Sequence, residues 1–241
     1  MRTPFIRARA VALAGICAGL AVLAGACGTG TGPSPAKTPS NGVASKPAAQ
    51  ILTMAKDALG SARSVRLQGT LTQSGATYTV NVVLGPDRGK GTVTGPIAGL
   101  KRASFDFVAL GSKAYIRSST MWRHFGGAAA AELLNNRWVA TTAKEMWGGA
   151  RFSTESFFGT LGPMTGPASK GAATTINGQP AIPVTSGNST VYVATTGTPY
   201  PLRLVPSSSK AGSGEINFLD YNAPLNITAP PHAIDLSKLH G

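Results

Sequence analysis

Residues 64–84 read SVRLQGTLTQSGATYTVNVVL, and this stretch decides the class of fold. Apolar side chains recur at every second position, at Val65, Leu67, Leu71, Tyr78, Val80 and Val82. An alternation of period two is typical of a strand with one buried face and one exposed face. The segment 73–76, which is polar and contains a glycine, separates the two runs. The sequence therefore predicts two antiparallel strands joined by a turn.

Further segments of this kind lie on both sides of a central region. On the N-terminal side, we predict strands at residues 90–94, 103–110 and 113–118. On the C-terminal side, we predict strands at residues 172–176, 181–186, 190–194, 202–206 and 214–221. Strands at short, regular spacing with glycine-containing turns between them favour an antiparallel sheet.

Three segments have the period of a helix instead. In Pro47–Ala62, the apolar residues recur at the spacing of one helix face, and the proline suits a first turn. Shorter helices are predicted at Ala128–Asn135 and Ser153–Leu161. Runs of strands interrupted by helices favour an α+β fold, with the helices gathered against one face of an antiparallel sheet.

The N-terminal residues have a different composition. Arg2, Arg7 and Arg9 precede an uncharged segment, residues 10–26, which ends in the small residues just before Cys27. A basic start, a short apolar segment and small residues at the end are typical of a secretory signal peptide. A cysteine directly after the small residues resembles a bacterial lipobox, in which the cysteine is diacylated. The alternatives are a signal peptide without acylation and a membrane-spanning helix, for which about 17 residues is short.

These patterns predict three parts of the chain. Residues 1–26 are the signal peptide, and residues 27–46 are the lipidated Cys27 and a flexible tether. The tether is rich in Gly, Pro, Ser and Thr, so it buries too little apolar surface to offset the entropy of ordering. Residues 47–241 form a single α+β domain, a size that suits one hydrophobic core.

The chain is basic, with a formal net charge of +13 over 241 residues. Its basic residues are scattered, and nucleic acid is not an expected partner of an exported, lipid-anchored protein. The positive charge suits an anionic lipid surface or cell-wall polymer, or it serves solubility alone. The two cysteines are Cys17 and Cys27; the first leaves with the signal peptide, so no disulfide is expected.

No motif of an enzyme is recognisable. The three histidines are His124, His232 and His240, and none belongs to a GxSxG, HExxH or similar pattern. The nine acidic residues form no close pair, and no glycine-rich segment has the lysine and the setting of a phosphate loop. The sequence therefore predicts a protein that is not an enzyme, with no cofactor and no metal site.

Four short motifs, in this order along the chain, carry a resemblance to a known family. They are the Ala58–Gly69 helix-to-strand junction, Arg137-Trp138-Val139, Pro201-Leu202-Arg203-Leu204 and Phe218-Leu219-Asp220-Tyr221-Asn222. With the lipobox, tether, helix and two sets of strands, the chain resembles the actinobacterial LprG/LppX-type lipoproteins, which are similar to the LolA/LolB lipoprotein carriers. The likeness covers about Ala48 to Pro231. It implies a strongly curved, half-open barrel with helices packed on its concave face, and a cavity for acyl chains of envelope lipids.

The resemblance implies a lipoprotein on the extracytoplasmic side of the cell membrane that binds or transfers lipid or glycolipid. Its partners would be the membrane, reached through the anchor, the envelope lipid, and a membrane transporter. The residues predicted to line the cavity are Leu67, Leu71, Val80, Val82, Phe105, Phe107 and Phe157. The alternative is a surface-anchored interaction module with a filled core, in which Arg102 and Arg123 contribute to partner capture. Periodicity does not separate the two, because a cavity and a filled core produce the same alternation.

Overall fold

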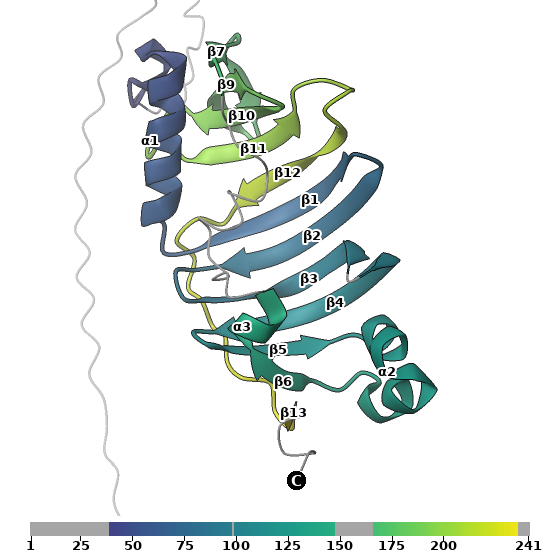
Figure 1. The fold of residues 1–241 in the computed structure, drawn as a ribbon. Helices are drawn as coiled ribbons and strands as arrows, with labels where there is room; N and C mark the ends of the chain where they lie inside the picture. Colours follow the sequence, from purple (N-terminus) through teal and green to yellow (C-terminus); the bar gives the residue numbers. More distant parts are fainter. Residues whose placement is uncertain (1–38, 98, 148–165, 236–241) are drawn as a thin grey trace, which may run out of the picture. The chain divides into compact units, whose positions relative to one another are not determined.

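The computed structural model describes residues 39–97, 99–147 and 166–235. They belong to one compact unit, Thr38–Gly241, whose described residues are coloured in Figure 1. The predicted signal peptide, Cys27 and the predicted helix Ser153–Leu161 lie outside the described residues. Within the described ranges, no helix is both long enough and apolar enough to cross a membrane.

The described strands form a single sheet. They are β1 (Val65–Gln73), β2 (Ala76–Leu84), β3 (Arg88–Ile97), β4 (Leu100–Leu110), β5 (Lys113–Arg117), β6 (Val139–Thr142), β7 (Ser169–Lys170), β8 (Thr174–Ile176), β9 (Gln179–Ser186), β10 (Ser189–Ala194), β11 (Pro201–Pro206), β12 (Ser213–Leu219) and β13 (Ile234–Asp235). Their order is β13-β6-β5-β4-β3-β2-β1-β12-β11-β10-β9-β7, and β8 pairs with β9. Among these strands, β7 and β13 do not pair with each other, so the sheet is open.

Two meanders join in the middle of this sheet. Strands β1–β5 follow one another as neighbours, and so do β9–β12. The two groups meet where β12 pairs antiparallel with β1, which sets Phe218 opposite Leu67. The result is the curved sheet of Figure 1, with helices beside it. The predicted α+β class with a curved, half-open antiparallel sheet is therefore confirmed; the one parallel pair described is β13 with β6.

The helices of the described part are α1 (Ala48–Ser61), α2 (Ser119–Leu134), α3 (Ala143–Trp147) and a short 3-10 helix, η1 (Val43–Ser45). Helix α1 agrees with the helix predicted for residues 47–62. Its buried face inserts Ile51, Ala55 and Leu59 into the main hydrophobic cluster of the sheet. The spacing of these three residues is that of one helix face.

Helix α2 differs from the prediction of a short helix at residues 128–135. It starts earlier because Ser118 caps it: the Ser118 hydroxyl accepts a hydrogen bond from the Met121 backbone N–H at 3.2 Å. Gly127 has non-helical angles, with φ 71° and ψ −162°. The helix is therefore kinked there, and it consists of two short segments.

The register of the strands gives the sheet one apolar face. Val82 in β2 lies opposite both Leu67 in β1 and Gly91 in β3, and Gly91 lies opposite Phe107 in β4. Residues directly opposite each other in an antiparallel pair share a face. We call this face the inner face and the opposite face, which carries Arg66, the outer face.

The end of the predicted tether is folded, which corrects the boundary expected at residue 46. The Asn41 side-chain amide donates hydrogen bonds to the carbonyl oxygens of Ala194 and Gly197, each at 3.0 Å. Val43 is fully buried and belongs to the main cluster. A single valine among polar residues has no periodicity, so the sequence carried no recognisable sign of this packing.

Hydrogen bonds tie three of the four short motifs together in space. The Ser64 hydroxyl, just before β1, donates to the Ala223 carbonyl oxygen at 2.6 Å. The Tyr221 hydroxyl, just after β12, donates to the Pro201 carbonyl oxygen at the start of β11, also at 2.6 Å. We call these contacts, with those of Asn222, the latch. It holds the ends of β1, β11 and β12 together where the two meanders join.

We expect the domain to lose stability at alkaline pH because of Tyr221 in the latch. Burial raises the pKa of Tyr221 well above its usual value, and Tyr200, stacked on it at 3.9 Å, raises it further. The folded state therefore keeps a proton that the unfolded state loses near pH 10. It follows that the contribution of Tyr221 to the free energy of unfolding is complete below about pH 10 and decreases as the pH rises further.

Tyr221→Phe is expected to cost about 1 kcal/mol at neutral pH, because it removes one buried hydrogen bond. Above about pH 10, the variant should lose stability less steeply than the parent, since one titrating group is gone. Urea unfolding at a series of alkaline pH values measures the slope of stability against pH for the parent and for the variant. Parallel slopes would contradict the assignment of this effect to Tyr221.

Candidate functional site

Six of the seven residues predicted to line a cavity lie together on the inner face. They belong to one hydrophobic cluster and are between 1% and 6% exposed: Leu67, Leu71, Val80, Val82, Phe105 and Phe107. The rings of Phe105 and Phe107 are 6.3 Å apart between centroids and tilted by 52°. The seventh predicted residue, Phe157, lies outside the described residues, as does the lipidation residue, Cys27.

The inner face is apolar well beyond these residues. The same cluster extends across β12, β11, β10 and β9 through Ile216, Leu204, Val191 and Val184, each no more than 1% exposed. In the register, each of these four residues lies opposite the next. The inner face is therefore a continuous apolar surface that runs across both meanders.

The described helices make their main contacts toward the two ends of the strand order. Helix α1 contacts β7, β9, β10 and β11, whereas α2 contacts β4 and α3 contacts β5 and β6. Figure 1 shows α1 and α2 on opposite sides of the long strands β1–β4. Four of the six predicted residues lie in β1 and β2, between the two regions that the helices contact, and Phe105 and Phe107 lie in β4, which α2 contacts.

At Gly91, strand β3 brings no side chain to the inner face. Gly91 lies between Val82 and Phe107, and its φ of +154° is a conformation that favours glycine. A Cβ at this position would overlap with the Asn81 carbonyl oxygen and the backbone of Val82. The close approach of β2 and β3 therefore requires a glycine here.

Among the described residues, one polar group is buried beside the cluster without a partner. Trp122 in α2 packs against the main cluster, and its indole Nε1 has no hydrogen-bond acceptor among the described residues. A buried N–H donor without an acceptor costs about 1–3 kcal/mol. Its buried position was not predictable from the sequence, because the segment 121–125 has no clear period.

The described residues hold no group of three or more His, Cys, Asp or Glu side chains that could bind a metal ion. His124 is exposed on α2 and lies against Phe125, with the ring centroids 5.1 Å apart. In the described part of the chain, carboxylates accept hydrogen bonds from arginine, threonine and asparagine side chains and from the Thr142 backbone N–H. These contacts tie strands and turns together.

A second site, which the sequence analysis did not identify, lies at the end of the long strands. It is an open groove of about 460 Å³, lined by Ser74, Gly75, Ala76, Thr77, Thr79, Thr94, Pro96, Lys101 and Arg102. Its threonine hydroxyls are hydrogen-bonded in pairs, for instance Thr79 to Thr70 at 3.0 Å. In the sequence, the adjacent cations Lys101 and Arg102 are the one feature that points to this groove. Its hydroxyl groups come from separate strands that only the fold brings together.

Comparison with known proteins identifies the fold. No protein-family model matches the chain, and no curated protein matches its sequence. Among solved structures, LprF from Mycobacterium bovis is similar over 76% of this chain and 96% of its own, with a TM-score of 0.54 and 14% sequence identity. The Mycobacterium tuberculosis lipoprotein LppX is similar over 75% and 98%, with a TM-score of 0.45 and 14% identity.

A putative outer membrane lipoprotein-sorting protein domain from Vibrio parahaemolyticus also matches over 76% of this chain and 95% of its own. Its TM-score is 0.25 and its identity is 11%. The predicted resemblance to the LprG/LppX-type proteins is confirmed as a likeness of fold, which at these identities carries no function with it.

Proposed function

We propose that this protein is an envelope lipoprotein that binds or transfers a lipid or glycolipid on the inner face of its sheet. In this proposal, residues 1–26 are removed, Cys27 is diacylated, and the anchor holds the protein at the extracytoplasmic side of the cell membrane. Two acyl chains are what stable anchoring requires. The single domain predicted for residues 47–241 would contain the lipid site and present it to a membrane transporter.

The observation that carries the proposal is the continuous apolar inner face. It would offer acyl chains a long surface across β1–β4, from the strands next to the α1 contacts to β4, which α2 contacts. Removing a methylene group from water contributes about 0.8 kcal/mol, so even one long acyl chain would supply a large driving force. The sheet is open, unlike a closed barrel, and in this proposal the lipid would enter at its open edge.

Trp122 would give such a ligand its orientation. Its indole N–H donor is buried at the margin of the apolar cluster and lacks an acceptor among the described residues. An ester carbonyl or a headgroup oxygen of a lipid is an acceptor of the right kind. Pairing the two would offset the cost of burying the donor.

The test is native mass spectrometry with lipid extraction, on a soluble form that begins at Gly28. This form contains the whole compact unit and both of its hydrophobic clusters. We expect a bound species of acyl-chain mass, either from an actinobacterial host or after incubation with envelope lipid. A mass without ligand in both experiments would contradict the proposal.

Val82→Phe tests where the lipid lies. Val82 points to the inner face and is 1% exposed, so a larger ring is expected to reduce the lipid bound per protein while thermal stability changes little. Val83→Phe is the matched control, because Val83 lies opposite Arg66 and Lys90 on the outer face. The control should keep its lipid.

A surface-anchored interaction module with a filled core is the second candidate. The exposure of Leu67, Val82 and Phe107 is only 1% each, which favours it. A filled core resists added volume, and overpacking costs about 1–3 kcal/mol. A clear loss of stability in Val82→Phe, with no lipid bound by the parent, would therefore favour the interaction module.

A further inference from the structure

Helix α2 exposes large apolar side chains. Phe125 is 63% exposed and Leu133 is 54% exposed, one on each side of the kink at Gly127. In the second segment of the helix, Ala131 and Leu134 are buried. Burial of one side fixes the helix, so the exposure of Phe125 and Leu133 is a property of the fold.

The same helix is attached firmly to the sheet. The Ser118 hydroxyl caps α2 and also donates a hydrogen bond to the Ser104 carbonyl oxygen in β4, at 2.7 Å. Ser118 is only 5% exposed. Near the turn between β3 and β4, a Cβ added to Gly99 would lie 3.8 Å from His124 Nε2. The turn and the first segment of α2 are therefore neighbours.

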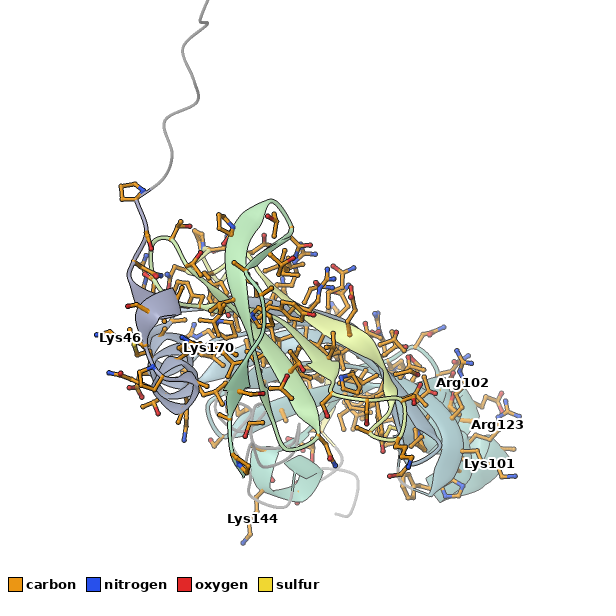
Figure 2. All side chains as sticks on the ribbon, turned by 90° about the horizontal axis from the view of Figure 1, so that it is seen from above. Lys46, Lys101, Arg102, Arg123, Lys144 and Lys170 are labelled. Carbon is orange, nitrogen blue, oxygen red and sulfur yellow. The ribbon has the colours of Figure 1, made fainter. Side chains whose placement is uncertain are left out.

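Three cations lie at the same end of the molecule as α2 (Figure 2). Lys101, Arg102 and Arg123 are exposed, and Figure 2 shows them together at the end of the molecule that carries α2. Their side chains have no ion pair among the described residues, whereas Arg66, Arg88, Arg117 and Arg203 each pair with a carboxylate. The acidic residue of α2 is Glu132, so the positive charge prevails. We call Phe125, Leu133, Lys101, Arg102 and Arg123 the tip.

The chemistry of the tip matches one kind of partner. At a bilayer surface, cations contact the anionic headgroups while neighbouring apolar side chains enter the acyl boundary. The open groove beside Lys101 and Arg102, with its threonine and serine hydroxyls, offers hydrogen bonds to headgroup oxygens. A protein partner of acidic character would match the cations but would leave the two protruding apolar side chains without a complement.

We propose that the tip is a membrane-docking surface that binds an anionic lipid bilayer. Its cations provide the attraction to the headgroups, and Phe125 and Leu133 insert at the interface. The inference goes beyond lipid binding inside the domain and does not require it. A carrier whose tip docks in this way would have its lipid site held at the membrane surface.

The test is sedimentation of the soluble form that begins at Gly28 with vesicles of equal parts phosphatidylcholine and phosphatidylglycerol, and with phosphatidylcholine alone. We expect binding to the anionic vesicles only. Each basic residue near an anionic surface contributes about five-fold in affinity, so K101Q/R102Q should weaken binding roughly 25-fold. The matched control is K46Q/K144Q, which removes the same charge at exposed positions away from the tip and should have a much smaller effect.

A second measurement separates insertion from attraction. The form that begins at Gly28 contains no cysteine, so F125C and K144C each provide a unique site for an environment-sensitive fluorophore. A blue shift on adding anionic vesicles is expected at position 125 and not at position 144. This readout, unlike mass spectrometry, does not depend on lipid inside the domain, so failure of either proposal leaves the other testable.

Several results would overturn the inference. They are equal losses in K101Q/R102Q and K46Q/K144Q, equal binding to vesicles without phosphatidylglycerol, or no fluorescence shift at position 125. If K101Q/R102Q lost binding to an immobilised anionic wall polysaccharide but kept vesicle binding, the partner would be the polymer and the membrane proposal would be wrong. Thermal unfolding of each variant confirms that the domain is folded.

Discussion

Replacing Gly69 with alanine is expected to destabilise the domain by about 3 kcal/mol or more. Gly69 lies in β1, where it pairs with both β2 and β12, the two strands through which the meanders join. Its φ is +157°, and an added Cβ would overlap with the Glu215 carbonyl oxygen of β12. A side chain at such an angle costs about 1–2 kcal/mol, and each ladder hydrogen bond lost as β12 moves away costs about 1 kcal/mol more.

Thermal unfolding measures this effect. For a domain of this size, 1 kcal/mol corresponds to about 2–4 °C, so the melting temperature should decrease by roughly 6–12 °C. Gly60→Ala is the matched control, because Gly60 lies in α1 and has open space around it. Alanine is favoured over glycine inside a helix by about 1 kcal/mol, so the control should be neutral or stabilising. Equal effects in the two variants would contradict the close contact of β1 and β12.

Replacing Asn222 with alanine is expected to cost about 3 kcal/mol. Asn222 belongs to the latch: its side chain accepts a hydrogen bond from the Arg63 backbone N–H and donates one to the Tyr200 hydroxyl, each at 2.9 Å. Each of these hydrogen bonds contributes about 1 kcal/mol. Its φ is +60°, a left-handed conformation that asparagine tolerates and alanine pays about 1–2 kcal/mol to adopt.

Asn222→Gly separates the two causes. Glycine adopts the left-handed conformation without strain but makes neither side-chain hydrogen bond. We therefore expect a loss of about 2 kcal/mol in urea unfolding, smaller than that of the alanine variant. Asn177→Gly provides a comparison, because Asn177 also has positive φ, of 50°, in the turn before β9, where its exposed side chain makes only long hydrogen bonds of 3.4–3.5 Å. It should change stability little. A loss in Asn222→Gly as large as in Asn222→Ala would show that strain contributes nothing.

The two variants and the tip illustrate a division of roles within the domain. Gly69 and Asn222 hold the central strands and their junction, on which the continuity of the inner face depends. Phe125 and Leu133 contribute little to that core, since more than half of each side chain is exposed. Variants at the tip are therefore expected to alter binding without altering stability, and variants at the junction to do the reverse.

The sequence alone was sufficient to predict the features that depend on residues close together in the chain. The alternation in residues 64–84 predicted β1 and β2, and it predicted that Leu67, Leu71, Val80 and Val82 would share a face, because side chains in a strand alternate with a period of two. The periodic apolar residues of α1 predicted its buried side in the same way. Six of the seven predicted site residues are described, and all six lie in one cluster; whether that cluster binds lipid stays a prediction.

Only the tertiary structure decided the features that depend on distant parts of the chain. The pairing of β1 with β12, the packing of Val43 and the hydroxyl-lined groove beside Lys101 each join segments that no local pattern connects. Helix α2 extends through residues 121–125 because Ser118 caps it and β4 holds the cap. Local periodicity reports which side of a segment is buried, but the partner that buries it is chosen by the packing of the whole domain. For this reason, the buried Trp122 donor and the exposed tip became visible only in the folded chain.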